Sequence, residues 1–171
     1  MGCEDDGVRL RTKRLSFREM TDGDLDTMAR LLGDPRVMTY YTRPKTREEA
    51  QRWIDWNKTN YREHGFGLWI LETHDGQFVG DCGLTVQEVE GHQQIEVGYH
   101  VCYERQHQGL ATEAATAVRT FAAEHRVDRL VAIIDPENVP SQRVAEKIGL
   151  RYEKTVWVFG GVQKLYSASL T

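Results

Sequence analysis

The stretch Gln106-His107-Gln108-Gly109-Leu110-Ala111 decides the fold, because it joins a predicted strand, Gln94–Cys102, to a predicted helix, Ala111–His125. The start of a helix exposes backbone N–H groups without internal partners and carries the positive end of the helix dipole. Gly109 and the small Ala111 let an anion approach this backbone, which makes the loop a candidate pyrophosphate site. A glycine before a helix is more often a simple turn, and neither the P-loop nor the dinucleotide-binding glycine motif occurs here.

Hydrophobic periodicity and turn signals divide the rest of the chain into further elements. Strands are predicted over Val8–Glu19, Phe66–Thr73, Gln77–Val86, Gln94–Cys102, Leu130–Ile134, Arg151–Phe159 and Val162–Leu170. Helices are predicted after the N-cap Thr21-Asp22 as far as Gly33, and over Thr46–His64, Ala111–His125 and Asn138–Ile148. The order β-α-α-β-β-β-α-β-α-β-β predicts an α/β (α+β) fold, with a mixed, mostly antiparallel sheet and helices on both faces.

Composition and charge narrow the class of protein. A chain of 171 residues is the size of one domain, so residues 1–171 are expected to form a single unit, with residues 1–7 as a disordered tail. A formal charge of −4 argues against nucleic-acid binding, and no apolar run approaches the roughly 18 residues of a membrane span. The odd number of cysteines, Cys3, Cys82 and Cys102, lacks metal-binding spacing and is typical of reduced thiols. We therefore expect a cytoplasmic protein without a metal.

A second motif lies further along the chain, where Pro136-Glu137-Asn138-Val139-Pro140-Ser141 leads into Val144-Ala145-Glu146-Lys147-Ile148-Gly149-Leu150. The first loop resembles the Q/R-x-x-G-x-G/A signature of the GNAT superfamily of N-acetyltransferases. The second motif is similar to the branch that acetylates ribosomal-protein N-termini, the RimJ and RimL type, and related amines. The two motifs stand in the family's order, and the resemblance covers essentially the whole chain.

The resemblance implies that acetyl-CoA is the cosubstrate. Its pantetheine arm would pair with the backbone of Tyr99 and Val101, in a V-shaped opening between this strand and Leu130–Ile134. Asn138 would bond the pantetheine amides as well as cap its helix, and Ser141 would lie beside the thioester. The pyrophosphate would rest on the backbone of Gln106, His107, Gln108, Gly109, Leu110, Ala111 and Thr112.

The resemblance also suggests the groups that move protons. The acceptor would be a primary amine, of a protein N-terminus or a small molecule, and would attack the thioester directly in a ternary complex. An amine is mostly protonated at pH 7, so a base is needed, and Glu96 is the first candidate, ahead of His100, His107 or a water relay. Ser141 or water would protonate the thiolate, because Ala145 stands where many family members carry a tyrosine acid.

The acceptor and the partners stay open at this stage. Aromatic residues such as Tyr41, Trp53 and Trp56 wall an acceptor pocket in one interpretation and fill the core in the other. A non-catalytic acyl-CoA-binding sensor or interaction module is the alternative function, since it would need neither Glu96 nor Ser141. The chain is expected to be a monomer or a homodimer.

Overall fold

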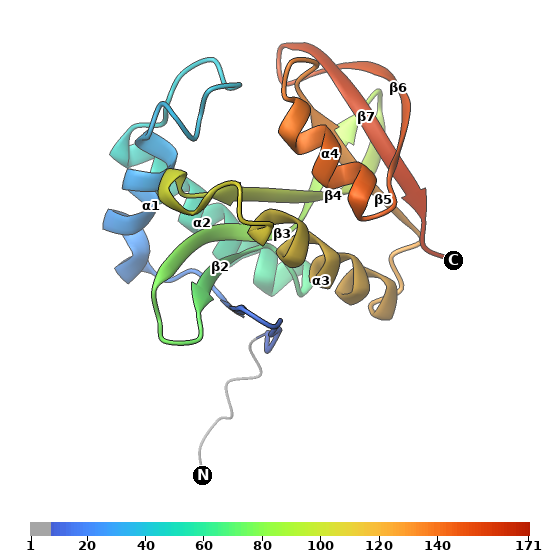
Figure 1. Ribbon diagram of the computed structural model, residues 1–171. Coiled ribbons are helices and arrows are strands. Elements are labelled where there is room, and N and C mark those ends of the chain that lie inside the picture. The colour runs from blue at the N-terminus through green and yellow to red at the C-terminus, as the bar shows by residue number, and fades with distance from the viewer. Residues whose placement is uncertain (1–7) are drawn as a thin grey trace.

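The computed structural model describes residues 8–171, which form one seven-stranded sheet with helices on both faces (Figure 1). The sheet order is β1-β2-β3-β4-β5-β7-β6, and every neighbouring pair is antiparallel except β4 and β5. The strands are β1 (Leu15–Arg18), β2 (Leu68–Thr73), β3 (Phe78–Val89), β4 (His92–Val101), β5 (Arg129–Ile134), β6 (Arg151–Val158) and β7 (Gly161–Ser169). The predicted fold class and element order are confirmed, whereas the expected tail and Cys3 lie outside the described residues.

The helices divide between the two faces of the sheet. They are α1 (Leu25–Gly33), α2 (Arg47–His64), α3 (Leu110–Glu124) and α4 (Val139–Lys147), and short 3-10 turns precede α1 (η1, Asp22–Asp24) and α3 (η2, Tyr103–Arg105). Helices α1 and α2 bury Met28 and Ile54 against β2. Helices α3 and α4 cover the other face, where Val118 and Ala145 join the larger core around Trp69. The loop of interest therefore lies where the chain leaves the sheet to cross this second face.

Local signals fixed the ends of α2 as predicted. The Thr46 side chain accepts a hydrogen bond from the Glu49 amide, and the Glu49 carboxylate accepts one from the Thr46 amide. This capping box satisfies two N–H groups that the helix cannot pair internally. Gly65 ends the helix with φ at +74°, a left-handed conformation that a glycine adopts without steric cost.

The first predicted strand is wrong over most of its length. Of the range Val8–Glu19, β1 keeps Leu15–Arg18, and the residues before it fold back on it. The Thr12 hydroxyl accepts a hydrogen bond from the Leu15 amide, and the Leu10 carbonyl accepts one from the Phe17 amide. The chain thus makes a tight turn that the alternation of apolar and polar residues does not reveal.

The sheet opens between its two central strands. Strands β4 and β5 pair over two positions, Ile95 with Leu130 and Glu96 with Val131. The pairing ends there, and β4 continues against β3 alone as far as Val101. The predicted V-shaped opening is present, and Figure 1 shows α3 and α4 on the side where the two strands part.

Candidate active site

The loop before α3 presents its backbone to one side of the opening. Its chain passes twice through the left-handed conformation, at His107 with φ +63° and at Gly109 with φ +79°. Gly109 is the N-cap of α3 and offers no side-chain oxygen to the first turn. The N–H groups of Leu110, Ala111 and Thr112 at the helix start are therefore suited to an external anion.

The side chains of the same loop differ in their surroundings. Gln106 turns back to the sheet, where its Nε2 donates a hydrogen bond to the Val101 carbonyl at 3.0 Å. His107 and Gln108 are exposed. Gln106 thus fixes the loop to the end of β4, which is a structural reason for a glutamine at this position.

Arg14 supports the loop from behind, a role that sequence reasoning missed. Its guanidinium donates to the Gln108 carbonyl at 2.9 Å and to the Glu113 carboxylate at 2.7 Å. Thr12 and the Arg14 amide also donate to Glu113. Burial raises the pKa of Glu113, but these hydrogen bonds lower it by more than burial raises it. The pKa of Glu113 therefore lies below its usual range. Helix α3 and its anion-binding end are thereby tied to the N-terminal segment.

The free edge of β4 carries the peptide groups of Tyr99 and Val101. The Cys102 amide donates to the Val79 carbonyl at 2.9 Å, so Cys102 is turned toward β3. In an antiparallel ladder, alternate residues turn their N–H and C=O groups to opposite neighbours. Tyr99 and Val101 therefore turn theirs to the opening. The Val101 carbonyl already accepts a hydrogen bond from Gln106, so an extended ligand arm lying there can pair with the Tyr99 peptide groups and the Val101 N–H as an added strand does.

Glu96 lies at the apex of the opening. Its Oε2 accepts a hydrogen bond from the Ile133 amide of β5 at 3.2 Å, and its Oε1 lies 3.4 Å from the Thr85 hydroxyl. Burial raises the pKa of Glu96 to about 8, although the hydrogen bonds from Ile133 and Thr85 act in the opposite direction. A carboxyl group in this environment keeps its proton at pH 7 and becomes a strong base once it is ionised.

Asn138 and Ser141 begin α4 on the other side of the opening. The Asn138 side-chain oxygen accepts a hydrogen bond from the Ser141 amide at 3.2 Å, which confirms the predicted N-cap. The Ser141 hydroxyl lies 2.8 Å from the Tyr99 hydroxyl, which also donates to the Ser141 carbonyl at 2.9 Å. Ser141 is therefore linked to β4 by a hydroxyl pair.

Tyr99 contributes its side chain to the site as well as its peptide group. The sequence drew attention to its backbone, yet its phenol enters the site next to Ser141. Burial raises the pKa of Tyr99, so the phenol keeps its proton over the physiological range. Ala145, where the resemblance suggested that many family members have a tyrosine acid, lies on the buried face of α4. A tyrosine hydroxyl thus approaches Ser141 from the sheet.

The aromatic residues between α1 and β2 have split roles. Trp69 is fully buried and packs edge-on against Phe17 and Phe121, so the core interpretation holds for it. The ring centroids of Trp53 and Trp56 lie 5.5 Å apart, so the two indoles share one face of α2. Tyr41 is half-exposed, and its hydroxyl contacts His100 of β4. These last residues lie on the α1/α2 side of the opening.

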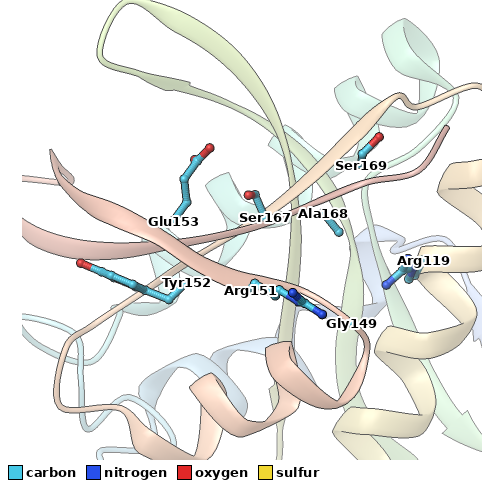
Figure 2. Close-up of a pocket in the computed structure, with 8 residues that line it drawn as sticks. All are labelled: Arg119, Gly149, Arg151, Tyr152, Glu153, Ser167, Ala168 and Ser169. Carbon is cyan, nitrogen blue, oxygen red and sulfur yellow. The ribbon is translucent and has the colours of Figure 1, made fainter.

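A shallow cavity elsewhere on the surface contains none of the predicted site residues. Figure 2 shows Arg119 of α3 facing Gly149 and Arg151, with Ser167 of β7 on the neighbouring strand. The Arg119 guanidinium is already bonded to the Ile148 carbonyl. Among residues 8–171, no group of three His, Cys, Asp or Glu side chains is arranged to hold a metal, and no helix is long and apolar enough to cross a membrane.

Comparison with known families agrees with this geometry. Residues 14–151 match the model of an acetyltransferase (GNAT) domain. The chain belongs to the GNAT family of acetyltransferases, and it is an acetyl-CoA-dependent acyltransferase. It is 40% identical over 152 residues to the uncharacterized protein YkkB of Bacillus subtilis, covering 87% of this chain and 88% of that one.

Two solved structures share the fold. An acetyltransferase from Agrobacterium tumefaciens superposes with a TM-score of 0.84 at 24% identity, over 94% of each chain. RimL, a ribosomal L7/L12 alpha-N-protein acetyltransferase in complex with coenzyme A, superposes with a TM-score of 0.74 at 14% identity, over 92% of this chain and 95% of that one. The expected likeness to the RimL type is confirmed at the level of the fold.

Proposed function

We infer that the protein transfers the acetyl group of acetyl-CoA to a primary amine by direct attack in a ternary complex. The observation that carries the inference is the opening between β4 and β5, with the anion-suited start of α3 at one side and Glu96 at the apex. Pantetheine pairs with Tyr99 and Val101 along the edge of β4, and the pyrophosphate binds the first N–H groups of α3.

The chemistry needs one base, one acid and one oxyanion donor. The acceptor ammonium first loses one proton, which ends in solvent. The neutral amine then attacks the thioester carbon, the C–N bond forms, the C–S bond breaks, and the second amine proton is balanced by the proton that the thiolate gains. Glu96 accepts the amine proton when it is ionised, and a backbone N–H of Tyr99 or Val101 stabilises the oxyanion. Ser141, hydrogen-bonded to Tyr99, protonates the departing thiolate.

The acceptor is proposed at the level of its chemistry, a primary amine of a protein N-terminus or of a small molecule. RimL acts on a protein N-terminus, which supports testing peptides alongside free amines. Membership of a family of transferases favours this function over a non-catalytic acyl-CoA sensor.

The test is a calorimetric titration with acetyl-CoA beside a thiol-release assay over a panel of peptides, amino acids, polyamines and aminoglycosides. We expect binding with one site per chain and thiol release that depends on one class of amine. Binding without thiol release from any amine would contradict the proposed reaction, and absence of binding would contradict the site.

A further inference from the structure

A buried polar pair lies on the α1/α2 side of the opening. Asp81 of β3 and His100 of β4 are cross-strand partners, and the Asp81 Oδ1 lies 2.8 Å from the His100 Nδ1. The Asp81 side chain is fully buried and that of His100 is 9% exposed. Trp53 of α2 donates its indole N–H to the other carboxylate oxygen of Asp81 at 3.2 Å. The proposed reaction, as described, makes no use of this pair.

The donor in each hydrogen bond follows from pairing a neutral His100 with an ionised Asp81. An ionised carboxylate accepts hydrogen bonds and donates none, so the His100 Nδ1 carries the proton that it shares with Asp81. The neutral imidazole then has its lone pair on Nε2, which lies 2.6 Å from the Tyr41 hydroxyl oxygen. Tyr41 is thus the donor in this bond. Its oxygen retains lone pairs that can accept a hydrogen bond from a ligand N–H.

The Tyr41 hydroxyl contacts His100, which lies on the same face of β4 as Glu96. Side chains alternate along a strand, so Glu96 and His100 share one face of β4, and the residue between them on that face is Gly98. No β4 side chain therefore lies between Glu96 and His100 on this face.

We propose that the Tyr41 oxygen binds the ammonium group of the acceptor, and that His100, oriented by Asp81, receives the acceptor's proton through Tyr41. This role rests on the proposed transfer to a primary amine. The ammonium gives one proton to the Tyr41 oxygen while the Tyr41 hydroxyl gives its own to the His100 Nε2. The amine becomes neutral, Tyr41 is unchanged, and His100 becomes an imidazolium paired with Asp81. The imidazolium later returns the proton to solvent.

The arrangement follows the logic of a hydroxyl–histidine–carboxylate triad, in which the buried carboxylate sets the tautomer and stabilises the imidazolium. The groups facing His100 are Asp81 on β3, Tyr41 before α2, and Glu96 further along β4. The Lys45 ammonium lies over the ring of Trp53, 5.3 Å from its centroid. Glu96 keeps its proton at pH 7, so Asp81 is the group that supplies negative charge next to His100 at that pH.

This relay and Glu96 act in different ranges of pH. With a pKa of about 8, the Glu96 carboxyl group holds its proton at pH 7 and cannot accept another. The relay through Tyr41 serves the reaction at that pH, and Glu96 contributes above pH 8. The two routes can be separated by measuring each variant at both values of pH.

The experiment compares Tyr41→Phe with Tyr40→Phe, its exposed neighbour in sequence, on the amine that the wild type uses best. We expect Tyr41→Phe to lower kcat/KM at pH 7 by about 10²-fold, the lower end of a typical acid–base contribution. The loss at pH 9 should be much smaller, and the Kd for acetyl-CoA should not change. His100→Gln and Asp81→Asn should show the same dependence on pH.

The outcomes separate this proposal from the proposed function. If the wild type turns over no amine, the acetyl-transfer reaction itself fails. If the wild type is active but Tyr41→Phe keeps its activity at pH 7, or loses equally at pH 7 and pH 9, the relay is overturned. Tyr41 is half-exposed, so Tyr41→Phe keeps the test decisive even if the buried His100→Gln does not fold.

Discussion

The Glu96 carboxylate accepts a hydrogen bond from the Ile133 amide across the point where β4 and β5 part, with 3.2 Å between Oε2 and N. In a parallel pair, that amide would face a carbonyl group of the neighbouring strand. The side chain takes the place of a backbone acceptor and satisfies the first amide beyond the last paired position, Val131. One carboxyl group thus helps to hold the site open and stands where the amine is expected.

Glu96→Gln should remove the alkaline part of the pH–rate profile. The wild type gains activity as Glu96 ionises with a pKa of about 8, whereas glutamine cannot accept a proton. We expect a loss of about 10²-fold in kcat/KM at pH 9 and a smaller loss at pH 7. Initial rates between pH 6 and pH 9.5 measure it, with the exposed Glu88→Gln as the control. A profile for Glu96→Gln parallel to that of the wild type would remove Glu96 from the mechanism.

The same substitution should change stability in a pH-dependent direction. The folded-state pKa of Glu96, about 8, lies above that of an unfolded glutamate, so the folded state binds the extra proton. Its contribution to stability is complete below the unfolded pKa and is lost as the pH rises through 8. Glutamine mimics the protonated form, so Glu96→Gln should gain in Tm relative to the wild type from pH 5 to pH 9. A constant difference in Tm would show that the carboxyl group is not perturbed.

Gly109→Glu should block acetyl-CoA. Gly109 has φ +79° at the N-cap of α3, where a side chain is strained and a carboxylate repels the pyrophosphate. We expect the Kd to rise by at least about tenfold, equivalent to about 1.4 kcal/mol. Gly91→Glu is the matched control, because Gly91 has φ +80° in the open turn between β3 and β4. Calorimetric titration of both variants decides, and equal affinities would refute the loop as the phosphate site.

Arg14→Gln should weaken acetyl-CoA binding without touching the cofactor's arm. The variant loses the guanidinium bonds to the Gln108 carbonyl and the Glu113 carboxylate that hold the loop. A charged hydrogen bond of this kind contributes about 1.5 kcal/mol, so the Kd should rise by about tenfold. Arg11→Gln, which loses an exposed contact to His74, is the control. Unchanged binding by Arg14→Gln would mean that the loop keeps its shape alone.

Ser141→Ala and Tyr99→Phe should act on the same step. Each removes one member of the hydroxyl pair, and each should lower kcat by about tenfold, less than Glu96→Gln does at pH 9. Because the two hydroxyls form one unit, the double variant should lose little more than either single variant. Single-turnover rates with acetyl-CoA bound measure the three losses. Losses that multiply would show that the two hydroxyls work independently.

Signals made by a few neighbouring residues were enough to predict the helices and most of the strands. Contacts between residues distant in the sequence could not be predicted. The two ends of α2, at Thr46 and Gly65, depend on a few adjacent residues and agree with the predicted range. Gly109 lies at the start of α3, and its role in binding a phosphate stays a prediction. The turn at Thr12 failed because a side chain, rather than apolar periodicity, reverses the chain there.

The site was predicted in part for the same reason. Asn138 and Ser141 belong to one contiguous motif, and Glu96 belongs to the strand that leads to the loop, so the sequence alone could propose all three. Their roles stay predictions. Arg14 reaches Glu113 over a separation of 99 residues, and Tyr41 reaches His100 over 59. Neither contact has a local pattern. The Tyr99 phenol has no local signal either, because the resemblance places the family's tyrosine on α4 and not on β4.

The two positions of pairing between β4 and β5 also have a mechanical consequence. Strands β1–β4 form one half of the sheet and β5–β7 the other, and the pairs within each half are antiparallel. The short pairing between β4 and β5 is the connection between the two halves within the sheet. A cofactor that binds in the opening would contact both halves, so its binding should stabilise the connection between them. At a ligand concentration of about 1,000 times the Kd, binding of the cofactor adds about 4 kcal/mol to the free energy of unfolding. The amide hydrogens of Tyr99 and Val101 should then exchange with solvent far more slowly than in the free protein. The bound cofactor would thus act as an added strand that stabilises the whole sheet.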